Sequence, residues 1–351
     1  MSNRSLTRHF TEWQKSDAAM VLATVIHTEG STYSKAGRHI LIRASGEHEG
    51  LLSGGCLEGD LAEHARTVLT NGAPLTITYD MRDTADDLWG IGLGCNGMMQ
   101  ILLQRLTADN NWQPFTAIAD AMARTTASTG ILITTSDTDE LQPGACFICD
   151  GSGHWQEAGT ALTKNPQQQQ PSAQLPATID HTTPTGPCTL LAWRIQPWPR
   201  ILLLGAGPDA VPVVQLASTM GWEITVADHR LHYIESGQYD AADRLQLVDP
   251  AKIIQQLPLK LYSAIVVMSH HIDTDRTYLQ QLSDNAINGL CYIGILGPAA
   301  RRAKLLSELD MSDTDFADRL HGPVGLDIGS DSPETIALSL ISEIQSVLSS
   351  A

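Results

Sequence analysis

The chain has 351 residues, which is enough for about two domains. Hydrophobic residues make up 42% and charged residues 17% of the sequence, a balance typical of a soluble globular protein with sizeable cores. The formal net charge of −17 argues against a nucleic-acid partner, whose phosphates need a basic surface, although local N–H groups can still hold a small anion.

No stretch approaches the ~18 consecutive apolar residues of a membrane helix. The first residues also lack the apolar core of a signal peptide. We therefore expect a cytoplasmic protein that makes no membrane contact. In that compartment the six cysteines are expected to be reduced thiols rather than a disulfide framework.

The first predicted elements are two strands joined by a loop. Residues 19–26 and residues 38–43 are apolar runs with β-branched side chains, which is typical of strands. Residues 29–37 between them have the composition of a loop.

A glycine pair and a cysteine stand directly before a predicted helix. Gly54 and Gly55 let the backbone adopt positive φ and let a ligand approach main-chain N–H groups. The apolar periodicity that follows predicts a helix over residues 57–71. Cys56 would then lie at a helix N-terminus, where the dipole lowers a thiol pKa, although the charge of Glu58 works against this. The alternative is a small buried cysteine beside a tight turn.

A second glycine-rich stretch, residues 90–97, contains four glycines and again a single cysteine. Such a density of glycine indicates backbone access to a ligand rather than packing. A strand is expected directly after it, over residues 98–103. The loops that carry Cys56 and the pair Gly94 and Cys95 could converge on one ligand. The alternative is two unrelated turns.

The rest of the first domain is predicted to contain both helix and strands. The expected elements are a helix over residues 117–127 and strands over residues 75–79, 130–135, 145–149 and 190–195. Cys146 and Cys149 have the spacing of a metal or redox pair. However, residues three apart in a strand point to opposite faces, which argues against a shared metal.

We place the domain boundary in the linker at residues 196–199. Residues 1–197 are then an N-terminal α/β domain, and residues 198–351 form a second domain. Residues 164–176 include four consecutive glutamines and are expected to be a flexible polar segment of the first domain.

The second domain opens with the order of a dinucleotide-binding unit. A buried strand at residues 200–204 runs into a turn with Gly205 and Gly207, then into a helix and a strand that ends in Asp228. Asp228 lies where an acid would bond a ribose 2′-OH and favour NAD. Asp209 departs from the pattern, because a carboxylate in this loop should repel a pyrophosphate. The sequence predicts a Rossmann-like, doubly wound parallel sheet, with NAD(P) or another nucleotide as its possible ligand.

A further core strand, residues 264–268, leads into His270 and His271. Ligands of open α/β sheets bind outside the carboxyl ends of the strands, so we expect these histidines to share a crevice with the glycine turn. They could bind a ligand, a metal or a proton, or they could belong to a solvated loop. Residues 301–304 carry three cations, which fits either an anion site or a solvated helix face.

Several motifs in order resemble the XdhC/CoxI family, the xanthine dehydrogenase accessory factors. The motifs are residues 53–59, 92–95, 205–208, 228–230, 269–271, 292–297 and 323–329. The resemblance implies a maturation factor that binds molybdenum cofactor, helps to keep its terminal sulfur intact and delivers it to a molybdenum hydroxylase client. A cysteine desulfurase or another cofactor-modifying enzyme is a further partner to consider.

On this hypothesis the cofactor phosphate binds glycine loops and a helix N-terminus, while the thiolates of Cys56 and Cys95 lie near the molybdenum. Glu58 is expected to support them. The expected cofactor-binding residues are Gly54, Gly55, Cys56, Glu58, Gly94, Cys95, Gly205, Gly207, Asp228, His270, His271 and Asp327.

The alternative hypothesis is an NAD(P)-dependent oxidoreductase built on the Rossmann unit. His270 or His271 would then be the catalytic acid near the nicotinamide. No Tyr-x-x-x-Lys or similar signature appears near the crevice, which favours the chaperone. A homodimer is expected because two-fold oligomers are the commonest.

Overall fold

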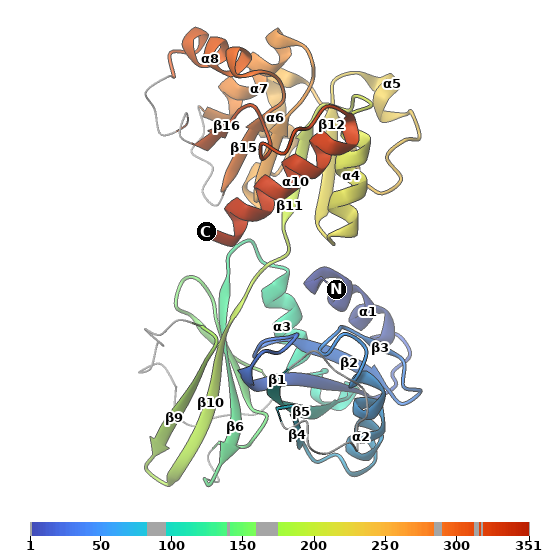
Figure 1. The fold of residues 1–351 in the computed structure, drawn as a ribbon, viewed down its shortest axis with the longest axis vertical. Coiled ribbons are helices and arrows are strands. Elements are labelled where there is room, and N and C mark those ends of the chain that lie inside the picture. Colours follow the sequence, from blue (N-terminus) through green and yellow to red (C-terminus); the bar gives the residue numbers. More distant parts are fainter. Residues whose placement is uncertain are drawn as a thin grey trace. The chain divides into compact units, whose positions relative to one another are not determined.

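The computed structural model describes residues 2–82, 96–138, 141–158, 175–283, 290–311, 316 and 319–350 (Figure 1). The chain divides into two compact units, Met1–Pro197 and Trp198–Ala351, which we call the N-terminal unit and the C-terminal unit. Gly94, Cys95 and residues 164–174, for which we made predictions, lie outside the described residues. Within the described part of the chain, no helix is long and apolar enough to cross a membrane.

The described residues of the N-terminal unit form two five-stranded antiparallel sheets. The first has the order β3-β2-β1-β5-β4, with β1 (Met20–Gly30), β2 (His39–Arg43), β3 (His48–Glu49), β4 (Leu75–Asp80) and β5 (Gly97–Leu106). The second has the order β8-β7-β6-β10-β9, with β6 (Ser128–Ser136), β7 (Cys146–Cys149), β8 (Trp155–Ala158), β9 (Ala177–Thr183) and β10 (Gly186–Ile195).

Helices pack against these sheets. They are α1 (Asn3–Gln14), α2 (Glu58–Asn71), α3 (Phe115–Met122) and the short 3₁₀ helix η2 (Ala108–Asn110). The apolar stripe of α2, which includes Leu61, Ala65 and Val68, is buried with Val21 and Ile40 on one face of the first sheet. The position of α2 therefore fixes where the loop before it lies.

The helix that we predicted over residues 117–127 is wrong in length. It ends at Met122, and β6 begins at Ser128. Thr125 and Thr126 lie between them, and such β-branched residues favour extended backbone over helix. Cys146 and Cys149 both lie on β7 and are buried, in line with their expected strand.

The C-terminal unit contains a parallel sheet with the order β13-β12-β11-β14-β15-β16. Its strands are β11 (Arg200–Leu204), β12 (Glu223–Asp228), β13 (Arg244–Leu247), β14 (Ala264–Val267), β15 (Tyr292–Ile295) and β16 (Leu320–His321). Its helices are α4 (Ala210–Thr219), α5 (Leu231–Ile234), α6 (Ile253–Gln256), α7 (Ile272–Ser283), α8 (Ala299–Glu308) and α10 (Pro333–Ser350), with 3₁₀ helices η4 (Pro250–Lys252) and η5 (Leu259–Leu261).

Apolar clusters cover both faces of this sheet. Leu203 of β11 packs with α4 and α10 on one face, which Figure 1 shows side by side, and Leu202 packs with α7 and α8 on the other. Burial on both faces explains the continuous apolar run of β11. The predicted Rossmann-like, doubly wound sheet is confirmed, and its strand order reverses between β11 and β14, where such folds bind ligands.

Candidate functional site

The first candidate site is the loop between β3 and α2, which Glu58 holds in shape. The Glu58 side chain is only 2% exposed. Its Oε1 accepts hydrogen bonds from the N–H groups of Leu52 (2.8 Å) and Ser53 (2.9 Å), and its Oε2 accepts from the Ser53 hydroxyl (2.5 Å) and the Gly55 N–H (3.0 Å). Glu58 therefore binds three backbone N–H groups of the loop, and one of them, the Gly55 N–H, belongs to the glycine pair that we had expected a ligand to approach.

The charge of Glu58 is stabilised by this arrangement. Burial acts to raise the pKa of Glu58, but the hydrogen bonds from Ser53 and Leu52 outweigh it and leave that pKa below its ordinary value. The Ser53 hydroxyl also accepts the Leu57 N–H at 2.8 Å, so Ser53 joins the loop to the first turn of α2. The carboxylate is a built-in anion that shapes the loop.

Cys56 is exposed at the end of this loop, one residue before the N-cap of α2. Gly54 and Gly55 precede it with φ values of +79° and +105°, in the region that favours glycine. A Cβ at Gly54 would lie 3.7 Å from Cδ2 of Tyr33, so the tyrosine ring lies beside the loop. The exposure of Cys56 excludes the alternative of a small buried cysteine.

A polar cluster that the sequence analysis missed lies in the first two turns of α2. Asp60 Oδ2 accepts a hydrogen bond from the Tyr79 hydroxyl at 2.5 Å and lies 3.4 Å from Nε2 of His64. Burial, together with the bond to Asp60, raises the pKa of Tyr79, so the phenol stays protonated at neutral pH. The i, i+4 spacing of Asp60 and His64 was a signal in the sequence, but Tyr79 on β4 carried none.

The described end of the second glycine-rich stretch packs against the loop after β1. The Ser31 N–H donates to the Asn96 carbonyl at 3.2 Å. A Cβ at Gly97 would lie 2.6 Å from the Ser31 carbonyl oxygen, so this close approach requires glycine. The same loop continues to Tyr33, beside Gly54. The convergence of Cys95 with Cys56 stays a prediction.

The second candidate site is the turn between β11 and α4. Gly205, with φ of +139°, donates its N–H to the Ala227 carbonyl at 2.8 Å, and a Cβ on it would collide with the backbone of Met268. A Cβ on Gly207 would lie 3.3 Å from Cδ2 of His270. The turn and the loop after β14 therefore lie together at the carboxyl end of the sheet, as expected.

A contact between a histidine and an aspartate covers this turn. His270 Nε2 lies 2.8 Å from Asp209 Oδ2, while Asp209 Oδ1 is buried with no hydrogen-bond partner among the described residues. His270 has φ of +64°, an uncommon conformation for a residue other than glycine. A Cβ on Gly207 would lie 2.9 Å from Asp209 Oδ1, which places the carboxylate against the glycine where a pyrophosphate would sit.

Asp228 is fully buried, and its two oxygens bind groups of this unit. Oδ2 accepts the Ala206 N–H at 2.7 Å, and Arg230 binds both oxygens through its guanidinium at 2.8–2.9 Å. Burial acts to raise the pKa of Asp228, but the hydrogen bonds from Arg230 and Ala206 leave it below its ordinary value. Asp228 thus anchors the glycine turn rather than projecting towards a ribose.

Two other expected residues are exposed. His271 lies 3.4 Å from the Thr274 hydroxyl through Nδ1. Asp327 follows β16 in a loop that is held to α10 by the Leu326 N–H and the Ser339 carbonyl, 3.3 Å apart. Within the described ranges, no hydrogen bond joins Asp327 to the glycine turn.

The cationic side chains of residues 301–304 make ion pairs or hydrogen bonds with other residues. Arg301 pairs with the fully buried Asp275 at 2.5 Å. Arg302 donates to a backbone carbonyl at 2.9 Å, and Lys304 lies 3.7 Å from Glu308. The two arginine contacts hold α8 against α7 and β16, the lysine contact lies within α8, and all three favour a structural role over an anion site.

The two sites differ in what they offer to a ligand. The β3–α2 loop displays a thiol, which is a soft nucleophile and metal ligand when deprotonated. The glycine turn displays a carboxylate–imidazole pair. No cluster of three or more Cys, His, Asp or Glu side chains suited to a metal ion occurs in the parts of the chain that the structure describes.

Known proteins resemble the chain in both units. The model of the XdhC and CoxI family matches residues 13–80, and that of the XdhC Rossmann domain matches residues 201–344. A probable xanthine dehydrogenase subunit of Bacillus subtilis (strain 168) is 32% identical over 324 residues, which is 92% of each chain. The molybdenum cofactor insertion chaperone PaoD of Escherichia coli (strain K12) is 21% identical over 347 residues, covering 98% of this chain and 88% of PaoD.

A solved structure resembles the whole chain. The crystal structure of a xanthine dehydrogenase from Bacillus halodurans matches with a TM-score of 0.79 and 28% identity, over 100% of this chain and 96% of that one. The fold and its sites define a two-domain α/β protein that joins an exposed-cysteine loop to a Rossmann domain. The chain belongs to the XdhC and CoxI family.

Proposed function

We propose that this protein is a maturation factor that binds molybdenum cofactor and inserts it, in sulfurated form, into a xanthine dehydrogenase-type molybdenum hydroxylase. The names of two relatives that match along most of their length support this role. The observation in this chain that carries the proposal is the exposed Cys56, displayed by a loop that a buried carboxylate shapes.

Each residue of the first loop has a part in the proposal. The Cys56 thiolate would approach the molybdenum–sulfur centre, because soft sulfur ligands suit it. Glu58 is a positioning residue, since it holds the loop and does not face the ligand. Gly54 and Gly55 let the cofactor approach the backbone. Cys95 is proposed as the second thiolate, next to Gly94.

The alternative, an NAD(P)-dependent oxidoreductase, is less well supported by the geometry. A dinucleotide needs an open glycine turn and an acid available to a ribose. Here Asp209 and His270 cover the turn beside Gly207, and Asp228 is bound to Arg230. We infer that the C-terminal unit serves the maturation role without hydride transfer.

The partners follow from the proposed cargo. The client is a molybdenum hydroxylase, and a cysteine desulfurase or another cofactor-modifying enzyme would supply the terminal sulfur. We place these steps in the cytoplasm and expect the protein to act as a homodimer.

Cofactor retention tests the proposal directly. Molybdenum cofactor released from a molybdoenzyme would be mixed with the purified protein, desalted and quantified through its oxidised, fluorescent pterin. We expect retention well above that of the heat-denatured protein, and activation of an apo-hydroxylase by the loaded protein. Retention no higher than the denatured control would refute the maturation role, and heat on titration with NAD or NADP would favour the oxidoreductase.

A further inference from the structure

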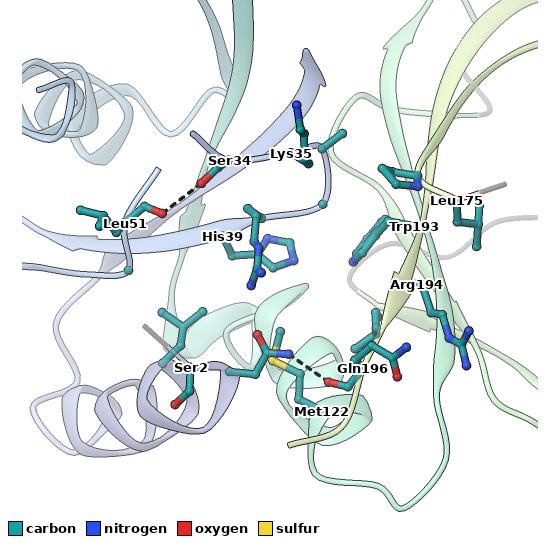
Figure 2. Close-up of a pocket in the computed structure, with 18 of the residues that line it drawn as sticks. Ser2, Ser34, Lys35, His39, Leu51, Met122, Leu175, Trp193, Arg194 and Gln196 are labelled. Atoms are coloured by element: carbon teal, nitrogen blue, oxygen red, sulfur yellow. Dashed lines mark hydrogen bonds between the residues drawn. The ribbon is translucent and has the colours of Figure 1, made fainter. Parts of the chain in front are cut away.

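A cavity of about 500 Å³ lies in the N-terminal unit, and the function proposed above does not use it. It is bounded by the start of α1, the loop after β1 and the end of β10 (Figure 2). Its volume falls within the range of small-molecule sites, roughly 300–1,000 Å³. The cavity is therefore large enough for an organic ligand.

The charge of the lining is opposite to that of the whole protein. Lys35, Arg38 and Arg194 line the cavity, and none of the described residues that line it is Asp or Glu. Ser2 and Asn3, the N-cap and first residue of α1, line it too, and a helix N-terminus carries partial positive charge. In a chain of net charge −17, this lining favours an anion.

His39 adds an unused hydrogen-bonding group to the lining. Its side chain is 7% exposed, and its Nδ1 lies 3.0 Å from the Thr24 hydroxyl. Its Nε2 is buried and has no hydrogen-bond partner among the described residues. Burial, and then the charge of Arg38, lower the pKa of His39 to about 3, so the imidazole is neutral at physiological pH. Such a buried polar atom is costly unless a ligand or a local rearrangement satisfies it.

An aromatic wall stands next to His39. The Trp193 and His39 rings form an edge-to-face pair with centroids 5.8 Å apart, and Figure 2 shows both at the cavity. A Cβ on Gly37 would lie 2.8 Å from the Trp193 side chain, and one on Gly130 would lie 2.5 Å from it. The indole therefore packs closely against the backbone of both glycines, which leave room for it. A fixed aromatic surface suits a planar heterocycle.

Residues that line the cavity also contact the β3–α2 loop that carries Cys56, which we call the Cys56 loop. Tyr33 lines the cavity and also lies beside Gly54. Ser34 and Leu51 line it as well, and the Ser34 hydroxyl donates to the Leu51 carbonyl at 3.2 Å, which Figure 2 marks. A ligand in the cavity would therefore contact the segments that lead to Cys56.

We propose that this cavity holds the phosphate-bearing pterin of the cofactor, while the Cys56 loop holds its metal–sulfur end. The inference rests on the proposed function. Arg38 and Lys35 would neutralise the phosphate, and His39 Nε2 would hydrogen-bond the pterin edge. The site thus recognises an organic phosphate on a planar, polar heterocycle.

Charge reversal at the rim tests this assignment. Arg38 is exposed, so Arg38→Glu should fold, and we expect it to weaken retention of molybdenum cofactor by about tenfold or more, because an attraction becomes a repulsion. Arg8→Glu is the matched control, since Arg8 is an exposed residue of the same unit that does not line the cavity. It should retain the cofactor as the wild type does.

A chemical footprint on the wild-type protein gives an independent readout. Lys35 and Lys15 both reach solvent, but only Lys35 lines the cavity. Bound cofactor should slow acylation of Lys35 by an amine-reactive ester severalfold and leave Lys15 unchanged, as measured by mass spectrometry. Inorganic phosphate and guanosine monophosphate serve as comparison ligands, and we expect weaker protection from both.

The outcomes separate the two proposals. If the wild type retains no cofactor, the proposed function fails. If the wild type retains it but Arg38→Glu and Arg8→Glu retain it equally, or Lys35 is not protected, the function stands and the cavity is not the pterin site. If inorganic phosphate protects Lys35 as well as the cofactor does, recognition of the heterocycle is refuted.

Discussion

The β3–α2 loop and the β11–α4 turn are both held by a buried carboxylate, but the first is exposed and the second is covered. In both, a buried carboxylate accepts from the backbone of a glycine-containing turn: Glu58 accepts three N–H groups in the first, and Asp228 accepts the Ala206 N–H in the second. In the first, this leaves Cys56 exposed. In the second, Asp209 and His270 cover the turn. A glycine-rich turn before a helix is therefore not by itself an open anion site, because a carboxylate of the chain can already occupy its donors.

The largest expected effect comes from Glu58→Gln. An amide NH₂ would face the N–H groups that the carboxylate now accepts, leaving buried donors unpaired. We expect the free energy of unfolding to fall by about 3 kcal/mol, as measured by chemical denaturation. Glu63→Gln, on the exposed face of α2, is the control and should change little. Equal stability of the two variants would show that Glu58 does not hold the loop.

The next largest expected effect is that of Cys56→Ser on cofactor retention and client activation. The two side chains are nearly the same size and Cys56 is exposed, so the fold should persist. Cofactor retention and client activation should fall by about tenfold, the loss expected for one good ligand contact. Cys291→Ser is the comparison, because Cys291 is half-buried next to β15 and its loss should affect stability more than delivery. Full activation by Cys56→Ser would remove the thiol from the mechanism.

Acid should remove the stability that the carboxylates of Glu58 and Asp228 contribute to the two units. Glu58 and Asp228 have pKa values lowered by folding, so the stability they contribute is complete above the ordinary carboxyl range, near pH 4, and is lost as pH falls through their folded pKa values. Glu58→Gln and Asp228→Asn should each lose less stability than the wild type between pH 6 and pH 3. Denaturation curves recorded across this range would test it, and parallel curves would contradict it.

The smallest expected effect concerns the covered turn. Asp209→Ala removes a negative charge from the N-terminus of α4, where anions are otherwise stabilised. Calorimetry should detect no ADP binding to the wild type and weak binding, about millimolar, to the variant. Tight binding of ADP by the wild type would mean that Asp209 and His270 move aside readily.

Much of the fold followed from local patterns. The apolar run of β11, the glycines after it and the acid at the end of β12 identified the Rossmann-like sheet, and the periodicity after Cys56 identified α2. These signals are periodic or adjacent in the chain, so they can be read without knowing the packing.

The contacts of the site residues were harder to predict from the sequence. Asp209 and His270 come from different strand–helix units, and their pairing depends on the sheet order. His39 stands in an apolar strand, where nothing in the sequence distinguishes a cavity-lining residue from a core one. Glu58 looked like a neighbour of Cys56, whereas its carboxylate points back into the loop.

The exposure of Cys56 also sets how the protein responds to oxidants. Cys146, Cys149 and Cys188 are buried, and burial raises their thiol pKa values, to about 12 for Cys146. Oxidation follows thiolate character and access, so among these four Cys56 reacts first. If Cys56 handles the cofactor as proposed, a mild peroxide pulse would cap that thiol while the cores stay intact. Delivery would stop without unfolding, and a cellular reductant would restore it from the sulfenic acid or a mixed disulfide.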